Sequence, residues 1–271
     1  MKTPTLHHIK LFLSLLSLSI FSTTLHATTN STSLSWQNPI YIQKAFNEIA
    51  LKNEYSTTEG RILKWNTPIR YEFVYHNLPK NPLIENLFNT HLQHLKTITG
   101  HSIQQYKPHY LGKANMFIHL TSDSDYGSVI QSLSSSPIPD IERNSHCMAH
   151  FKQNRQNAIT QAQIVLPVDH VFSKGLLVTC IVEETTQILG LPNDSDWVNP
   201  SIANDASKIE LLTGLDYLFL KILYDKSLKA GLPYPQNQKA IQRIIQKLAN
   251  NGEIKHAHQT IKQTGLYPII H

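Results

Sequence analysis

The segment CIVEETTQILGLPND, residues 180–194, constrains the fold more than any other part of the chain. Apolar residues recur in it at helical spacing, which predicts a helix with an apolar face. A glycine and a proline follow, beginning with Gly190, and predict a sharp turn at the end of this helix. Such a turn would bring residues 193–194 back beside Glu183 and Gln187.

The N-terminus is typical of an export signal. Lys2 and Lys10 precede the apolar run LFLSLLSLSIF, and the small residue Ala27 ends the segment TLHA. The run is too short to span a bilayer comfortably, so we expect residues 1–27 to be a signal peptide cleaved near Ala27. No later segment is long and apolar enough to cross a membrane. The expected mature protein is therefore periplasmic or secreted, without a membrane span, and 244 residues long (271 less 27).

The charge of the chain argues against nucleic acid as a partner. The full chain carries a formal net charge of +5, and loss of Lys2 and Lys10 with the signal peptide lowers it to +3. The remaining basic residues form no run. Because nucleic-acid-binding domains concentrate their basic residues in a patch or stripe, we expect no such partner here.

Two cysteines, Cys147 and Cys180, remain in the expected mature chain. An exported protein with a single cysteine pair usually oxidises it, so we expect a disulfide that ties the predicted helix to the segment around Cys147. The alternative is a partial metal site formed by Cys147 and His150 in CMAH, which would need further ligands at suitable spacing.

Strand and helix patterns alternate in the first part of the chain, and helices dominate the second. The helical patterns cover residues 42–51, 82–99, 123–136, 171–189 and 238–251, and a further helix is predicted after the capping-box pair Thr213 and Asp216. The strand patterns cover residues 61–76, with an interruption at Pro68, 114–122 and 159–169. This order predicts an α/β (α+β) fold in which helices pack on a mixed sheet and a smaller helical C-terminal lobe follows.

The same order predicts a division of the chain. After the signal peptide, we expect a leader and N-terminal helix at residues 28–58. The sheet-containing domain would occupy residues 59–232, and a C-terminal helix and tail residues 233–271.

The predicted helix at residues 171–189 and the loop after it are acidic in an otherwise basic protein. No Lys or Arg occurs between Lys174 and Lys208, whereas acidic residues stand at positions 183, 184, 194, 196 and 205. One interpretation is an ordinary solvated helix, with Glu183 and Gln187 as an i, i+4 pair and Gly190 as the C-cap. The other interpretation is the wall of a cleft.

The span EETTQILGLPN resembles the zinc-binding motif of metzincin peptidases, His-Glu-x-x-His-x-x-Gly-x-x-His. Glu183, Gln187 and Asn193 stand at the histidine positions, Glu184 at the general-base position and Gly190 at the turn glycine. The segment LTGLDYLFLKILYD is similar to the helix that follows the Met-turn in those enzymes. The resemblance implies a metzincin-like fold with the motif helix at the cleft.

A larger part of the chain is similar to a bacterial family of unknown function, DUF2927. The similarity covers residues 60–232 and is carried by the blocks RILKWNTPIRYEF, LKTITG, VEETTQILGLPNDSD, NPSIANDAS and LLTGLDYLFLKILYDKSLKAGL.

The donor set differs from that of a zinc enzyme. Catalytic zinc takes three donors, usually imidazole or carboxylate, and the amides of Gln187 and Asn193 are weak zinc ligands. No methionine follows Met148 to form a Met-turn. Oxygen donors from Glu183, Gln187, Asn193 and Asp194 suit a hard divalent cation such as calcium or magnesium better than zinc. We therefore expect no zinc, and a hard divalent cation is the cofactor with which these residues are compatible.

Three functions are compatible with these observations. In the first, the cleft binds a peptide or an envelope protein without ordinary zinc catalysis; its candidate binding residues are Glu183, Gln187, Asn193, Asp194 and Trp197. In the second, Glu184 is the general base of an active hydrolase. In the third, Glu184 hydrogen-bonds within the core and the protein has a structural or interaction role. An open cleft lined by Glu183 and Gln187 would favour the first two, and a covering loop the third.

Overall fold

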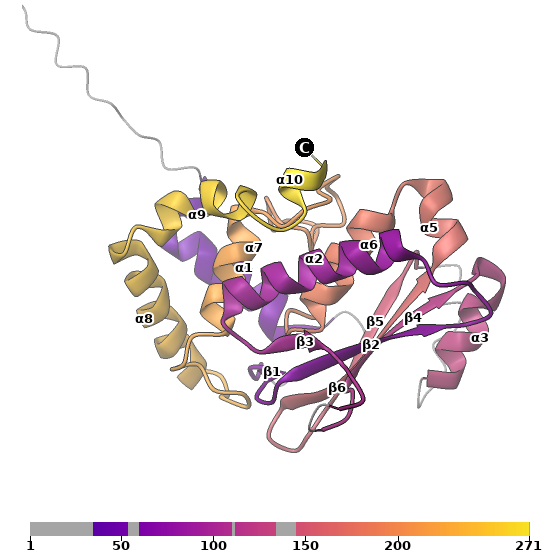
Figure 1. Ribbon diagram of the computed structural model, residues 1–271. Helices are drawn as coiled ribbons and strands as arrows, with labels where there is room; N and C mark the ends of the chain where they lie inside the picture. Colours follow the sequence, from indigo (N-terminus) through magenta and orange to yellow (C-terminus); the bar gives the residue numbers. More distant parts are fainter. Residues whose placement is uncertain (1–34, 54–59, 110–111, 134–144, 271) are drawn as a thin grey trace, which may run out of the picture. The chain divides into compact units, whose positions relative to one another are not determined.

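A sheet of six strands lies at the centre of the structure (Figure 1). The structure is a computed structural model that describes residues 35–53, 60–109, 112–133 and 145–270. The strands are β1 (Lys64–Trp65), β2 (Ile69–Tyr75), β3 (Ile103–Gln105), β4 (Met116–Thr121), β5 (Met148–Gln153) and β6 (Ala158–Pro167). Their order is β1-β6-β4-β2-β3, with β5 also paired to β6. All pairings are parallel except that of β5 with β6, which is antiparallel.

Helices cover both faces of this sheet. On one face, α2 (Pro82–Thr99) packs on β3 and on α6 (Leu177–Gln187), which also contacts β5 and β6. On the other face, α3 (Asp123–Leu133) packs on β4 and β6. Side chains alternate along β6, so that Ile164 joins the main core and Val165 joins a smaller cluster with Tyr126 of α3. The motif helix α6 is therefore part of the layer that buries the main core.

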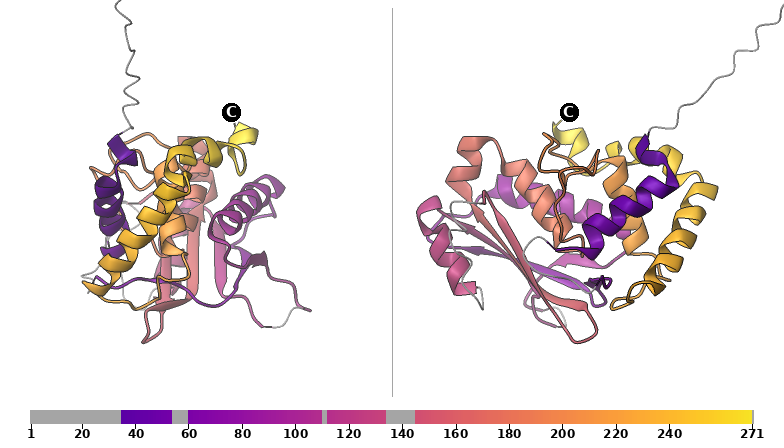
Figure 2. Two further views of the ribbon diagram at one scale, coloured as in Figure 1. Left: turned by 90° about the vertical axis from the view of Figure 1, so that its left-hand side faces the viewer. Right: turned by 180° about the vertical axis from the view of Figure 1, so that it is seen from behind.

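A group of helices packs together beyond β1, at the end of the sheet away from α3 (Figure 2). It contains α1 (Pro39–Leu51), α7 (Gly214–Leu223), α8 (Gln236–Asn250) and α9 (Glu253–Lys262). The N-terminal α1 contacts α7 and α8, so the helical part is not purely C-terminal. In the part of the chain that the structure describes, no helix is long and apolar enough to cross a membrane.

The loop that precedes α7 is fixed by a buried carboxylate. Thr213 caps the helix and forms a capping box with Asp216, as the sequence predicts. Asp216 also accepts hydrogen bonds from Ser201 Oγ at 2.6 Å and from the Ile202 backbone N–H at 3.1 Å. Burial raises the pKa of Asp216, although these bonds oppose the shift. The loop between α6 and α7 is therefore held at its centre as well as at its ends.

The α/β class and most helix positions predicted from sequence are confirmed. The predicted single helix at residues 171–189 is wrong, because the chain forms α5 (Val168–Lys174) and α6 with a break at Gly175, whose φ is 71°. Two strands, β3 and β5, and the helices α9 and α10 (Tyr267–Ile270) are not predicted from the sequence. β3 has three residues, and β5 is a half-exposed strand with polar residues at its end, so neither carries a clear apolar alternation.

The described residues all belong to the unit Ser33–His271. The expected signal peptide lies outside the described residues, and the division at residues 58/59 and 232/233 stays a prediction.

Candidate functional site

The turn after α6 depends on Gly190. Its φ is 112°, and a Cβ at this position would collide with the carbonyl oxygen of Leu63. The Gly190 backbone N–H donates to the Gln187 carbonyl at 2.9 Å. Only glycine satisfies both the backbone conformation and the close approach of Leu63, the residue before β1. The predicted sharp turn is confirmed.

This turn brings Asp194 back against the end of α6. Gln187 Nε2 donates to Asp194 Oδ1 at 2.9 Å, and Asn193 Nδ2 donates to the Asp194 carbonyl oxygen at 2.6 Å. The Asn193 backbone N–H donates to the Ile49 carbonyl of α1 at 3.2 Å. The return of residues 193 and 194 beside α6, which the sequence predicts, is thus observed, and the two amide side chains hold Asp194.

A second loop segment adds Asp205 to the same place. Ser195 and Asn204 form an isolated parallel bridge, and the Asp205 backbone N–H donates to the Ser195 carbonyl at 3.2 Å. In consequence Glu183, Asp194 and Asp205 each offer a carboxylate oxygen within 4.8 Å of the other two. The sequence places Asp205 in the acidic stretch but does not predict it in the site, because no local pattern shows that the loop closes on itself.

The concentration of acidic groups affects the proton affinity of Asp205. Partial burial raises the pKa of Asp205, and the negative charge of Asp196 raises it further. Carboxylates at this spacing are suited to bind a hard cation or a positively charged side chain, because either would offset their mutual repulsion. We call Glu183, Asp194 and Asp205 the acidic site.

Glu184 lies on a different side of α6 from the acidic site. It is 5% exposed and belongs to a buried stretch with Thr185 and Thr186. Burial raises the pKa of Tyr126 on α3, and the negative charge of Glu184 adds to this shift. Thr186 and Gly190 are buried as well. Helix α6 is enclosed on most sides.

The loop after Asp194 packs partly over the acidic site. Glu183 and Gln187 are half-buried, and Asp205 of this loop lies beside Glu183. Trp197 is 42% exposed, and its ring meets Tyr41 of α1 edge-on, with the ring centroids 6.0 Å apart. The acidic site is thus accessible to solvent at its rim, where Asp205 is exposed.

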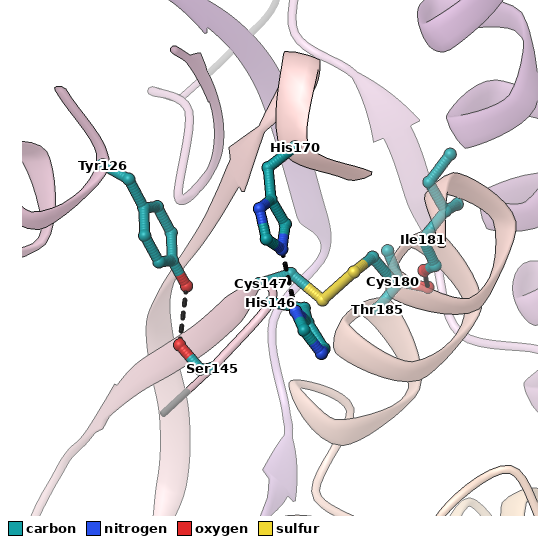
Figure 3. Close-up of a disulfide and its surroundings, with 8 residues drawn as sticks. All are labelled: Tyr126, Ser145, His146, Cys147, His170, Cys180, Ile181 and Thr185. Atoms are coloured by element: carbon teal, nitrogen blue, oxygen red, sulfur yellow. Dashed lines mark hydrogen bonds between the residues drawn. A yellow bond between two sulfur atoms is a disulfide. The ribbon is translucent and has the colours of Figure 1, made fainter. Parts of the chain in front are cut away.

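The predicted disulfide between Cys147 and Cys180 is confirmed, with an S–S distance of 2.03 Å (Figure 3). It joins the start of β5 to α6, and both partners belong to or border the main core. Because the thiol of Cys147 is oxidised, the alternative metal site of Cys147 and His150 is not formed. A disulfide of this kind is typical of a protein outside the reducing cytosol.

Together these elements define a mixed α/β protein with a disulfide-tied helix and an acidic helix–loop site. The family model described as "Protein of unknown function (DUF2927)" matches residues 39–243. The chain belongs to this family. A search of the curated proteins and a search of the solved structures both give no match.

Proposed function

We propose that this DUF2927 protein is an exported binding protein with a metzincin-like fold. Its acidic site binds a basic segment of a peptide or envelope protein, without zinc catalysis. The observation that carries the proposal is the arrangement of Gln187 and Asn193. Both amides, at positions that would be zinc ligands in a metzincin, donate hydrogen bonds to Asp194.

The fold part of the proposal has two supports. A mixed sheet packed by helices precedes the motif helix, and α5 and α6 follow directly on β6. Gly190 makes the turn that the motif assigns to its glycine. These features support a metzincin-like position of α6 in the fold. They do not bear on whether its side chains bind a metal ion.

The residues present do not fit a catalytic zinc ion. Zinc in hydrolases takes imidazole or carboxylate donors and keeps a position for water. Of the positions equivalent to the histidines, only Glu183 offers such a donor. The amide groups of Gln187 and Asn193 orient their N–H donors toward Asp194, and an N–H group is no metal ligand.

The hydrolase alternative depends on Glu184. A general base must reach the proton that it abstracts, directly or through a water molecule. Glu184 is 5% exposed and lies apart from the acidic site, whose carboxylates come from Glu183, Asp194 and Asp205. Burial at this level favours a structural role for Glu184 over a catalytic one.

Charge supports the choice of a basic partner. The acidic site lies in a stretch without Lys or Arg, in a chain whose net charge is +5. A basic peptide is attracted to such a site by a screened electrostatic interaction, which weakens as salt increases. The half-exposed Trp197 near the same loop offers a ring that can pack on the aliphatic part of Lys or Arg.

The experiment compares synthetic peptides of equal length that are basic, neutral or acidic, by fluorescence anisotropy with the purified chain. We expect the basic peptide to bind most tightly and to weaken with salt. The double variant Glu183→Gln/Asp205→Asn should reduce its affinity about tenfold or more, whereas Glu72→Gln, an exposed carboxylate on β2, should not. Equal affinity for the three peptides would contradict the proposal.

A second experiment tests the absence of zinc catalysis. The natively purified protein is assayed for zinc content and for peptidase activity with and without a chelator, beside Glu184→Gln. Stoichiometric zinc together with chelator-sensitive activity that Glu184→Gln abolishes would replace the binding proposal by the hydrolase alternative.

A hard cation is the second candidate occupant of the acidic site. The convergence of carboxylate oxygens within 4.8 Å favours it, and Ca²⁺ accepts such oxygen ligands. Calorimetric titration with Ca²⁺, Mg²⁺ and Zn²⁺ distinguishes the two: saturable Ca²⁺ binding that Asp205→Asn removes, with no peptide preference, would favour the cation.

A further inference from the structure

Two imidazole rings meet edge to edge beside the disulfide (Figure 3). His146 Nδ1 and His170 Nε2 are 2.8 Å apart, the ring centroids are 5.1 Å apart, and the planes differ by 24°. The ring centroids are as far apart as the nitrogen–nitrogen distance and the two ring radii allow. Both nitrogens therefore lie on the line that joins the two ring centroids. The two lone-pair positions therefore point at one another, with one proton shared between them.

The second nitrogen of His170 faces a carboxylate. Asp123 Oδ1 lies 3.5 Å from His170 Nδ1. This favours a proton on Nδ1 and leaves the lone pair on Nε2, which faces His146. A carboxylate behind a histidine is the usual arrangement around metal-binding histidines, because it fixes the tautomer and orients the ring.

The backbone that carries both rings is well fixed. His146 precedes Cys147, which is bonded covalently to α6, and β5 begins at the next residue. His170 lies in α5, directly after β6, and Asp169 accepts a hydrogen bond from the Asp123 backbone N–H at 2.7 Å. Ligands on a rigid scaffold bind a metal without a large ordering cost.

The pair is also open to solvent. His146 is exposed, the His170 side chain is 22% exposed, and that of Asp123 is 56% exposed. A metal ion can therefore reach the two nitrogens, and water molecules can complete its coordination.

We propose that His146 and His170 form a binding site for a divalent transition-metal ion, with Cu²⁺ the most tightly bound of this class. Metal–nitrogen bonds are about 2.0–2.1 Å long, so two adjacent nitrogens on a tetragonal Cu²⁺ ion are about 2.9 Å apart. The ion lies on the lone pair of His170 Nε2, and the exposed His146 ring turns aside so that its Nδ1 also faces the ion. The proton between the two nitrogens passes to solvent, and His146 then carries its ring proton on Nε2. Imidazole suits copper and zinc, and copper binds more tightly in the divalent series. This proposal is independent of the acidic site.

A second histidine pair in the same protein provides a natural comparison. His76 Nε2 and His119 Nδ1 are also 2.8 Å apart, with the centroids 5.1 Å apart. His119, however, is only 6% exposed, and its other nitrogen lies 2.7 Å from Gln163 Oε1. Water molecules cannot complete a metal coordination shell at a buried ring, so this pair is expected to stay a hydrogen-bonded pair.

The experiment titrates the tag-free, chelator-treated chain with CuCl₂ and ZnCl₂ by calorimetry, and records the electron paramagnetic resonance spectrum of the copper form. We expect one Cu²⁺ per chain with nitrogen ligands, and weaker binding of Zn²⁺. His146→Ala and His170→Ala should each lower the copper affinity at least tenfold, and Asp123→Asn by about tenfold. The controls His76→Ala and His256→Ala, the latter an exposed histidine on α9, should bind like the unmodified chain.

The outcomes are distinct. Unchanged copper affinity in both His146→Ala and His170→Ala, or a spectrum without nitrogen ligands, overturns the proposal. Loss of binding in Asp205→Asn but not in His170→Ala assigns the metal to the acidic site and also overturns it. Thermal unfolding of each variant, with the disulfide intact, separates loss of a ligand from loss of the fold.

Discussion

Gln187 and Asp194 join the end of α6 to the loop that returns along it. Gln187 Nε2 donates to Asp194 Oδ1 at 2.9 Å, between residues seven positions apart. The hydrogen bond closes the turn that Gly190 makes possible, and it fixes one carboxylate of the acidic site. The geometry of the site thus depends on a residue that carries no charge.

Removal of this hydrogen bond tests its contribution. Gln187→Ala should lower the free energy of unfolding by about 1–2 kcal/mol, because a half-buried carboxylate loses a donor. Gln242→Ala, at an exposed position of α8, is the matched control for helix propensity and should change stability by less than about 0.5 kcal/mol. Urea unfolding measures both. Equal effects of the two changes would show that the bond contributes nothing measurable.

Gly190→Ala tests the close approach at the turn. The added Cβ would collide with the Leu63 carbonyl and sit at a φ of 112°, so we expect a loss of at least about 2 kcal/mol. Gly100→Ala is the matched control, since Gly100 has a φ of 66° with no atom within 4 Å of the added Cβ. It should cost about 1 kcal/mol. If both variants lost the same stability, the collision with the Leu63 carbonyl would have no role.

The turn illustrates what the sequence could predict. Gly190 and Pro192 indicated a sharp reversal, and the spacing of Gln187 and Asp194 made their contact a geometric consequence. The break at Gly175 was not predicted, because the apolar spacing continues through it in the sequence. A single glycine inside a helical pattern is often tolerated, so sequence alone does not distinguish a break from a continuous helix.

The acidic site illustrates what the sequence could not predict. Asp205 lies 11 residues after Asp194, and its position depends on the bridge between Ser195 and Asn204 and on the buried Asp216. No local pattern encodes these contacts. The burial of Glu184 is not encoded locally either. Helix α6 packs on both α2 and β5, and this packing encloses Glu184, although the helical spacing places it near the polar side of the helix.

The disulfide between Cys147 and Cys180 should contribute substantially to stability. The two residues are separated by 33 positions, and closing a loop of this size stabilises a fold by about 3–4 kcal/mol in the chain-entropy model. Cys147→Ser/Cys180→Ser should therefore lose about this amount in urea unfolding. The unmodified chain under reducing conditions is the control and should match the double variant. A double variant as stable as the oxidised chain would contradict the prediction.

Two histidines of α2 should make the protein sensitive to mild acid. Burial lowers the pKa of His91 to about 3, with a further contribution from His94, and burial lowers the pKa of His94 to about 4. The unfolded chain binds protons at these residues near pH 6.5, whereas the folded chain does not. Stability is therefore fully present above pH 6.5 and falls as the pH decreases toward 4, by up to about 1.4 kcal/mol per pH unit for each residue.

His91→Leu isolates one of these contributions. Within the described residues His91 Nε2 has no hydrogen-bond partner, and the ring's bond to the Val182 backbone contributes about 1 kcal/mol, so an apolar side chain of similar size should be largely tolerated at neutral pH. We expect the variant to unfold at a similar urea concentration at pH 7 and to lose less stability than the unmodified chain between pH 6.5 and 4. His256→Leu, at an exposed position of α9, is the control and should follow the unmodified chain. Parallel pH profiles of His91→Leu and the unmodified chain would show that a buried neutral His91 is not a source of the acid sensitivity.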